Sequence, residues 1–178
     1  MSLIYEEDLR PKALKKAARS MMVAARTAPK GRGIDYISIA MAEREDIEKI
    51  AKRMFEIDQE MDFPAFSRDA KNLLKADAMI ILGTKIKSVG LKKCGMCGFK
   101  NCAEKDKHPN HPCVFNTTDL GIAVGSAVSV AMDMRVDNRV FYTAGQAILD
   151  LNLLGDEVKI VYAIPLSSGS KNIFFDRG

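Results

Sequence analysis

Residues 78–82 read Ala-Met-Ile-Ile-Leu, and Gly83 follows them. Five consecutive apolar residues, two of them β-branched, are typical of a strand that is buried on both faces of a sheet. Such a strand needs other elements to cover the sheet on each side. The segments on either side of residues 78–82 therefore decide the architecture.

The chain before this strand alternates between helix and strand patterns. Residues 8–27 carry their apolar side chains on one side, which predicts a helix. Residues 34–41 (IDYISIAM) alternate in part and are β-branched, which predicts a strand. Residues 43–61 have apolar positions at helical spacing and acidic residues in the first turn, so they predict the clearest helix. A short helix is expected over residues 67–75.

The chain after residue 117 continues the same alternation. Thr118 and Asp119 are good N-cap residues, so we expect a helix from there to about Met134. A shorter helix is expected over residues 143–151, and a strand over residues 157–164 with a proline as its end. Strands that alternate with helices predict an α/β or α+β protein whose sheet is covered by helices, and the family resemblance given below favours α+β. The length of 178 residues fits a single domain over residues 1–178.

Composition and charge exclude several classes of protein. Apolar residues make up 47% of the chain and charged residues 28%, which is ordinary for a globular protein. The net charge of +4 is too mild to indicate a nucleic-acid partner. The N-terminal residues lack an apolar signal segment, and the longest apolar stretch, residues 120–132, is too short to span a membrane. We therefore expect a soluble cytoplasmic protein, in which thiols stay reduced and clustered cysteines favour a metal over a disulfide.

All four cysteines lie within 20 residues of one another. The motif is Cys94-Gly-Met-Cys97-Gly-Phe-Lys-Asn-Cys102, followed after ten residues by Cys113. Iron–sulfur clusters are held by four thiolates whose spacing varies between families. A Cys-x2-Cys turn lets two sulfurs point at one centre, and the glycines let backbone N–H groups approach the sulfurs. The pattern predicts that Cys94, Cys97, Cys102 and Cys113 bind an iron–sulfur cluster, within a loop over residues 84–117 that shows no clear period.

Zinc is the alternative metal. Zinc is held by four cysteines, or by cysteines and histidines, and zinc fingers use paired Cys-x2–4-Cys units. His108 and His111 lie close to Cys113 in sequence, so a site of three cysteines and one histidine is an alternative. The Cys102-x10-Cys113 half is not a paired unit, and the histidines belong to a His-Pro-Asn-His-Pro run that is typical of a turn. The pattern favours iron–sulfur, and a zinc-stapled structural or interaction module remains the alternative.

The cysteines are surrounded by lysines. Between Lys85 and His111 there are seven lysines and only two acidic residues, a local excess of +5 against a net charge of +4 for the whole chain. These lysines predict either a solvated loop or a functional one. A functional loop would offset the negative charge of thiolates and a cluster, or dock an acidic redox partner protein.

Two resemblances follow from these motifs. Residues 93–104 resemble the four-cysteine iron–sulfur domain of corrinoid iron–sulfur proteins and related redox subunits, which implies a 4Fe–4S cluster. The stretches MMVAARTAPKGRGIDYISIAMAEREDIEKIAKRM, ADAMIILG, DLGIAVGSAVSVAMDMRVDNRV and EVKIVYAIPLSSGSKNIFFDR resemble the flavin-dependent nitroreductases. The whole chain is similar to the uncharacterised family described as containing a ferredoxin domain. This resemblance implies a nitroreductase-like mixed sheet covered by helices, with the cysteine-rich loop inserted after a core strand.

The nitroreductase resemblance also implies an FMN site at a homodimer interface. By position, the flavin-phosphate turn would contain Arg26, Pro29, Lys30 and Gly31, and Lys171 or Arg177 would add charge. Basic side chains and open N–H groups suit a phosphate. The Arg-Ser-x-Arg motif of these flavoproteins is missing, because Arg19-Ser20 lies inside the first predicted helix and is followed by Met21. A basic turn without a ligand is the alternative for this segment.

Small residues on the long helix also indicate close packing. Gly121, Gly125 and Ser129 recur at four-residue spacing, which lets another backbone come close, either inside the domain or across a dimer. Together these features predict a redox protein that transfers electrons or reduces an unknown substrate, and with FMN bound it would be a flavin and iron–sulfur oxidoreductase. A flavin-free electron carrier or sensor and the zinc module are the competing functions. No Ser/His/Asp or paired-carboxylate arrangement indicates a general acid or base.

Overall fold

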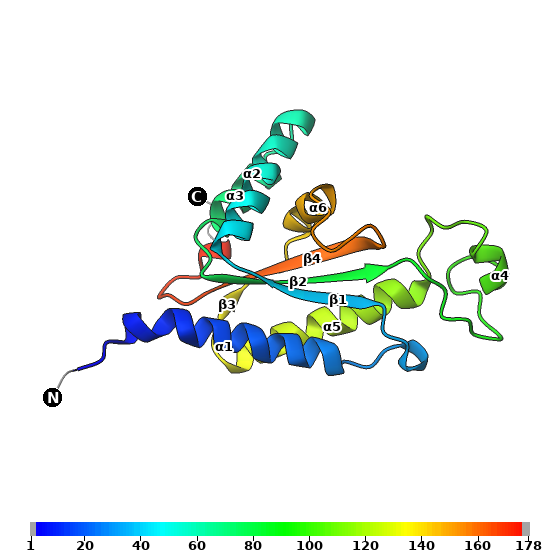
Figure 1. Ribbon diagram of the computed structural model, residues 1–178, viewed down its shortest axis with the longest axis horizontal. Helices are drawn as coiled ribbons and strands as arrows, with labels where there is room; N and C mark the ends of the chain where they lie inside the picture. The colour runs from blue at the N-terminus through cyan, green and yellow to red at the C-terminus, as the bar shows by residue number, and fades with distance from the viewer. Residues whose placement is uncertain (1–2, 176–178) are drawn as a thin grey trace.

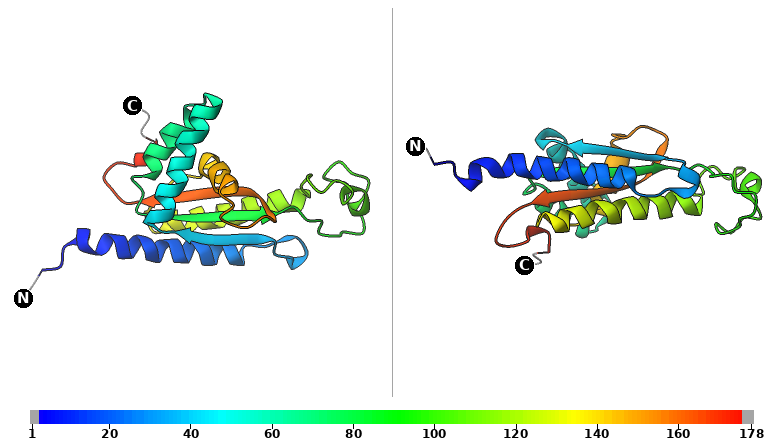
Figure 2. Two further views of the ribbon diagram at one scale, coloured as in Figure 1. Left: turned by 45° about the horizontal axis from the view of Figure 1, so that its top comes forward. Right: turned by 90° about the horizontal axis from the view of Figure 1, so that it is seen from below.

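The computed structural model describes residues 3–175 and has three layers (Figure 1). A four-stranded sheet lies in the middle, with α1 and α5 on one face and α2, α3 and α6 on the other. Figure 2 shows α1 and α5 side by side across their face of the sheet. The helices are α1 (Glu6–Thr27), α2 (Arg44–Met61), α3 (Ala65–Leu73), α4 (Cys102–Lys105), α5 (Val114–Asp133) and α6 (Tyr142–Asp150), with short 3-10 helices η1 (Gly31–Gly33) and η2 (Ile173–Phe175). The predicted α+β class is confirmed.

The described strands pair antiparallel throughout, in the order β1-β2-β4-β3. They are β1 (Ile37–Ala42), β2 (Ala78–Lys85), β3 (Asp137–Asn138) and β4 (Val158–Ser167). The expected mixed sheet is therefore wrong in its strand directions. Within residues 3–175, β1 with β2, β2 with β4 and β3 with β4 all pair antiparallel, and no parallel pair forms.

Strand β2 separates two hydrophobic cores. Side chains alternate between the faces of a strand, and Met79 and Ile81 pack into the core under α2, α3 and α6. Ile80 and Leu82 pack into the core under α1 and α5. All four side chains are at most 4% exposed. The continuous apolar run that predicted this strand is thus explained by helices on both faces.

Helix boundaries agree with the sequence pattern except at α5. This helix begins at Val114, four residues before the expected N-cap, and Cys113 caps it instead. Thr118 therefore lies inside the helix, and Asp119 is buried and reaches the turn after α1. The irregular segment between β2 and α5 is consequently shorter than the expected 84–117 and covers residues 86–113. We call residues 86–113 the cysteine loop.

The expected end of the last strand at Pro165 is also wrong. Strand β4 continues to Ser167, and Pro165 pairs with Met79 of β2 in the register. Ala163 exchanges both of its backbone hydrogen bonds with Phe141, on the side away from β2. Pro165 lies two residues after Ala163 on the same strand, so its nitrogen also points away from β2. The residues on that side form no regular strand beside Pro165. No ladder hydrogen bond is lost there.

Helix α5 has one buried and one exposed side. Leu120, Ala123 and Ala127 are at most 1% exposed and face the sheet. Met132 is 67% exposed, and only 33% of the most apolar 18-residue window is buried. The helix is long and apolar enough to cross a membrane by length and composition alone, and it is the one such helix among the described residues. Its buried side shows that it also serves as a core helix of this fold.

Candidate metal centre in the cysteine loop

The four cysteines lie at different points of the cysteine loop. Cys94 and Cys97 precede α4, Cys102 is the first residue of α4, and Cys113 is the N-cap of α5. All four are free thiols. Cys113 is 5% exposed, and the other three are half-buried. The loop projects beyond the sheet at one end of the molecule, away from both termini (Figure 1).

Local hydrogen bonds shape the loop around the cysteines. The Gly98 N–H donates to the Gly95 carbonyl at 2.9 Å, and Gly98 has a φ of 89°, which favours glycine. This turn begins directly after Cys94 and contains Cys97. Asn101 then caps α4 by accepting the Glu104 N–H at 2.9 Å. The Cys-Gly pattern and the Asn N-cap therefore account for the local backbone, as their residue types suggest.

Asn116 fastens the two ends of the cysteine loop together. Its Oδ1 accepts the N–H groups of Lys87 and Cys113, each at 3.1 Å. Its Nδ2 donates to the Lys87 carbonyl at 2.9 Å. Asn116 is 2% exposed, so these bonds are shielded from water. Nothing in the spacing of the cysteines pointed to this residue, although it follows the fourth cysteine by three positions, where an N3 side chain can reach the N-cap.

Arg32 ties the same end of the loop to the turn after α1. Its Nη1 donates to the carbonyls of Val89 and Gly90, at 2.9 and 3.0 Å. Arg32 has a φ of 57°, an uncommon conformation for a residue other than glycine. The sequence reasoning missed this contact as well, because it joins residues that are 57 positions apart.

The outer part of the loop has a small interior of its own. The Phe99 ring stacks on His108 at a centroid distance of 5.0 Å, and the edge of His111 lies 5.6 Å from it. Ser88 Oγ donates to Asp106 at 2.6 Å. The histidines therefore pack on an aromatic ring in a turn, as the His-Pro-Asn-His-Pro run suggested.

The donor set fits a metal chemically, but the sulfurs are not gathered. Among residues 3–175 no three of the His, Cys, Asp and Glu side chains are placed so that they could hold one metal ion. Cys102 Sγ faces the Leu91 carbonyl at 3.9 Å. Cys113 has the most firmly held backbone of the four, because its N–H donates to Asn116 Oδ1 at 3.1 Å and its carbonyl accepts the Asn116 N–H at 2.9 Å. Loading a metal would require the outer loop to bring the other sulfurs toward Cys113.

The turn predicted to hold a flavin phosphate is occupied by internal contacts. Arg26 pairs with Asp35 and also donates to the Ile37 carbonyl. Lys30 is 5% exposed, and its Nζ donates to the last carbonyls of α1, those of Ala25 and Arg26. Lys171 lies four residues after the end of β4 and is exposed, and Arg177 is outside the described residues. The turn thus satisfies its own charges.

The Gly31 N–H is also engaged by an anion of the protein. It donates to both carboxylate oxygens of Asp119, each at 3.1 Å. Burial raises the pKa of Asp119, and the Gly31 N–H and the charge of Lys30 oppose that rise. For Asp35, burial works against ionisation, but the Ile37 N–H and Arg26 outweigh it and lower its pKa. The backbone donor that would meet a phosphate therefore already holds a carboxylate, and this turn does not fit a flavin phosphate as it stands.

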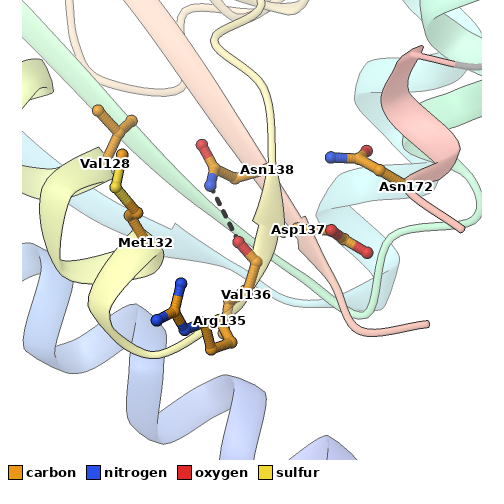
Figure 3. Close-up of a pocket in the computed structure, with 7 residues that line it drawn as sticks. All are labelled: Val128, Met132, Arg135, Val136, Asp137, Asn138 and Asn172. Atoms are coloured by element: carbon orange, nitrogen blue, oxygen red, sulfur yellow. Dashed lines mark hydrogen bonds between the residues drawn. The ribbon is translucent and has the colours of Figure 1, made fainter. Parts of the chain in front are cut away.

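Cavities among residues 3–175 also lie outside the predicted sites, and two of them are large enough to describe. One, of about 520 Å³, opens at the C-terminal end of α5 (Figure 3). Its lining is formed by Val128, Met132, Arg135, Val136, Asp137, Asn138 and Asn172. The other, of about 480 Å³, lies between the start of α1 and the segment after β4. It is lined by Glu6, Arg10, Ser168, Gly169 and Ser170, and Arg10 pairs with Glu6 there. Sequence reasoning assigned neither cavity, because each joins residues from distant segments.

The fold is that of the nitroreductases. A nitroreductase family protein from Clostridium novyi has a TM-score of 0.60 at 13% identity, over 97% of this chain and 81% of that one. A provisionally named nitroreductase from Desulfovibrio desulfuricans, solved in complex with FMN, has a TM-score of 0.59 at 12% identity, over 96% and 78%. Identities this low show the fold alone.

The chain belongs to the family described as uncharacterized proteins containing a ferredoxin domain (DUF2148). The family model matches residues 109–177, which include the last cysteine, α5 and β4. An uncharacterized protein from Archaeoglobus fulgidus is 38% identical over 185 residues, which cover 98% of this chain and 97% of that protein. The resemblance drawn from the sequence is therefore confirmed.

Proposed function

We propose that this protein is an iron–sulfur redox protein in which Cys94, Cys97, Cys102 and Cys113 hold one 4Fe–4S cluster. The observation that carries the proposal is the cysteine loop itself. Every cysteine of the chain is a free thiol in one projecting segment whose two ends are fastened by Asn116. The ferredoxin domain in the description of the family supports the same reading. The cluster, when bound, supplies a centre that takes up and gives up single electrons.

The residues of the loop have separate tasks in this proposal. Cys113 is the anchored ligand, since the start of α5 and the hydrogen bonds with Asn116 fix its backbone. Cys94 and Cys97 approach from a turn whose glycines leave room for the backbone, and Cys102 approaches from the first turn of α4. The surrounding lysines offset the negative charge of four thiolates. The four cysteines and their loop, residues 86–113, form an insertion in a single nitroreductase-like domain.

Metal analysis tests the proposal directly. Protein purified without oxygen should be brown and contain iron and acid-labile sulfide, and Cys97→Ser and Cys113→Ser should each lose both. His108→Ala should retain them, because the proposal gives no ligand role to the histidines. Stoichiometric zinc without sulfide, reduced by His108→Ala or His111→Ala, would instead establish the zinc-stapled module.

Flavin binding is a second candidate, favoured by the nitroreductase-like fold. The loop after α1 does not present a free phosphate site, so we derive no catalytic step through a flavin. The cavity beside Arg10 offers a guanidinium and two serine hydroxyls once the Glu6 ion pair opens. With FMN bound, the protein would be a flavin and iron–sulfur oxidoreductase. Without it, the electron carrier or sensor is the better reading.

An FMN titration separates the two locations for the phosphate. If the protein binds FMN and quenches its fluorescence, Arg10→Gln should weaken FMN binding when the phosphate lies beside the Ser168–Ser170 segment. Lys30→Gln should weaken it when the phosphate lies in the turn after α1, and each tenfold loss corresponds to about 1.4 kcal/mol. Lys49→Gln, on the exposed side of α2, is the matched control for a lost positive charge. No heat of binding at high FMN concentration would remove the flavin from the proposal.

We also propose that the protein is a homodimer through α5. Gly121, Gly125 and Ser129 are exposed, and a methyl group placed on either glycine would meet no atom within 4 Å. The close packing that these residues predicted therefore does not occur inside the chain. A partner across this apolar side would supply it and would shield α5 in a soluble cytoplasmic protein without a membrane.

Sedimentation tests the dimer without disturbing the fold. Gly125→Leu should convert a dimer into a folded monomer, because the added side chain meets open space within the chain and a clash only across the interface. Lys49→Leu adds a similar side chain to an exposed position elsewhere and should leave the dimer intact. A monomeric wild-type protein at tens of micromolar would contradict the proposal.

A further inference from the structure

Positive charge is concentrated in the cysteine loop and its attachment to β2. Seven lysines and two acidic residues lie between Lys85 and His111. Elsewhere the chain holds 20 of its 27 basic residues and 21 of its 23 acidic residues. The body of the protein is therefore nearly neutral, and the projecting end carries the charge that a distant partner would sense.

Four of these lysines are free to meet a partner. Lys92, Lys93, Lys100 and Lys107 are exposed, and their ammonium groups form no ion pair within residues 3–175. Other lysines of the region are engaged: Lys105 is 2% exposed beside Asp106, and Lys85 pairs with Glu157. The free ammonium groups thus belong to the outer part of the loop, next to Cys94, Cys97 and Cys102 in the chain. We call these four residues the lysine rim.

An apolar side chain accompanies the lysine rim. Met96 stands between the first two cysteines in sequence and is 72% exposed, among the most exposed large apolar residues described. Small interfaces between electron-transfer proteins are brief and weak, and they commonly combine an apolar contact with charged surroundings. Methionine suits such a contact because its side chain adapts to different surfaces.

We propose that the lysine rim and Met96 form the docking surface for an acidic one-electron carrier protein. This inference rests on the proposed iron–sulfur centre, which lies in the same loop. In each encounter the reduced carrier loses one electron and the centre in the loop gains it, and no bond forms or breaks. Docking at this end brings the carrier to the cysteines themselves, which suits a partner that exchanges electrons with them.

The test uses a strongly acidic plant-type [2Fe–2S] ferredoxin as the carrier. Its second-order rate of electron transfer to the anaerobically purified protein should fall steeply from about 0.01 to 0.5 M ionic strength, as the Debye length falls from roughly 30 Å to below 10 Å. Replacing the whole rim (K92Q, K93Q, K100Q and K107Q) should lower the low-salt rate roughly ten- to hundredfold and flatten the salt dependence. Iron and sulfide are assayed in the rim variant as well, so that rates are compared per loaded centre.

A matched variant separates local charge from net charge. K49Q, K52Q, K71Q and K75Q remove the same four charges from exposed positions on α2, α3 and the segment after α3. This control should retain most of the rate and the salt dependence of the wild type. Equal losses in the two variants would overturn the inference, because net charge alone would then account for the effect. Met96→Gln should weaken docking at high salt more than at low salt, since it removes an apolar contact.

Binding of the oxidised ferredoxin, measured by calorimetry, gives a readout that needs no electron transfer. Weakened binding in the rim variant and not in the control supports the inference, and unchanged binding in both overturns it. Tight binding of a short single-stranded oligonucleotide that is lost in the rim variant, without ferredoxin binding, also overturns it. Absence of iron and sulfide would reject the iron–sulfur function, and the calorimetry would still decide whether this surface docks an acidic protein.

Discussion

Two basic, glycine-containing segments of this chain have opposite relations to their surroundings. In the turn after α1, Lys30 is buried against helix carbonyls and the Gly31 N–H is held by Asp119. In the cysteine loop, the four lysines of the rim are exposed and unpaired. The two segments look alike in sequence, and both suggested a bound anion or cluster. Acidic residues in neighbouring elements make the difference.

The comparison shows that the positive charges and N–H donors of a basic segment can be satisfied by acidic residues of the same fold. Asp35 lies in the segment before β1, and Asp119 lies in α5. Both carboxylates lie beside the turn. The cysteine loop projects from the body (Figure 1), and within residues 3–175 no ion pair joins the four rim lysines to a carboxylate. A turn whose donors and charges are satisfied serves the structure, and a loop whose charges are free remains available to a ligand or partner.

The largest expected effect is at the attachment of the cysteine loop. Asn116→Leu would leave the Lys87 N–H, the Lys87 carbonyl and the Cys113 N–H buried without their partner. We expect a loss of about 3 kcal/mol in the free energy of unfolding, with lower iron content, because the anchored cysteine loses its position. Denaturant unfolding and iron analysis would measure both. Asn110→Leu, at an exposed position in the same loop, should change stability by less than about 0.5 kcal/mol.

A second effect concerns space at the two segments. A Cβ on Gly31 would lie 2.7 Å from Phe115 Cδ1, so Gly31→Ala must displace a ring that packs beside the start of α5. We expect a loss of about 2 kcal/mol, as for other overpacked sites. A Cβ on Gly95, in the cysteine loop, would lie 3.4 Å from its nearest neighbour, the Phe99 carbonyl. Gly95→Ala should therefore be nearly neutral by thermal unfolding, and equal losses in the two variants would contradict the contrast in packing.

A third effect tests the lysines directly. Lys30→Gln removes an ammonium group that satisfies two carbonyls at the end of α1, and should cost about 1 kcal/mol. Lys100→Gln removes an exposed and unpaired ammonium group, and should change stability by less than about 0.5 kcal/mol. Denaturant unfolding of both metal-free proteins provides the comparison. A larger loss at Lys100 than at Lys30 would show that the loop, and not the turn, depends on its charge for folding.

The outcome at these segments shows what sequence patterns can predict. The run at residues 78–82 and the apolar side of residues 43–61 predicted β2 and α2, because periodicity reports burial directly. The start of α5 was misplaced, because Cys113 and Asn116 cap each other in a way that residue preferences rank below Thr118 and Asp119. The strand directions were misassigned because local pattern does not determine pairing.

The cysteines could be predicted as a group, but their surroundings could not. Four thiols in a short segment indicate metal chemistry from residue type alone. The contacts of Asn116 and Arg32 with the loop, and of Asp119 with Gly31, join positions that are 29 to 88 residues apart. A single sequence carries no periodic signal for such contacts. The flavin-phosphate role stays a prediction for Arg26, Pro29, Lys30, Gly31 and Lys171. The positive charge of this segment was visible in the sequence, whereas the distant residues that contact it were not.

The smallest expected effect is a difference in pH dependence between the two acids of the turn. Burial raises the pKa of Asp119, so its folded state takes up a proton more readily than its unfolded state. Its favourable contribution to folding is therefore present below the unfolded pKa near 3.8 and is lost as the pH rises through the higher folded value. For Asp35, the Ile37 N–H and Arg26 overcome burial and lower the pKa, so its contribution is present above 3.8 and is lost as the pH falls through the lower folded value.

Asp119→Asn should thus gain stability relative to the wild type as the pH rises above 3.8, and Asp35→Asn should lose stability relative to the wild type over the same range. Unfolding by urea, measured for both variants and the wild type from acidic to neutral pH, would show the two differences with opposite slopes. Slopes of the same sign would mean that the Gly31 N–H and the charge of Lys30 outweigh burial at Asp119, and the carboxylate would then occupy the backbone donor of the turn even more firmly.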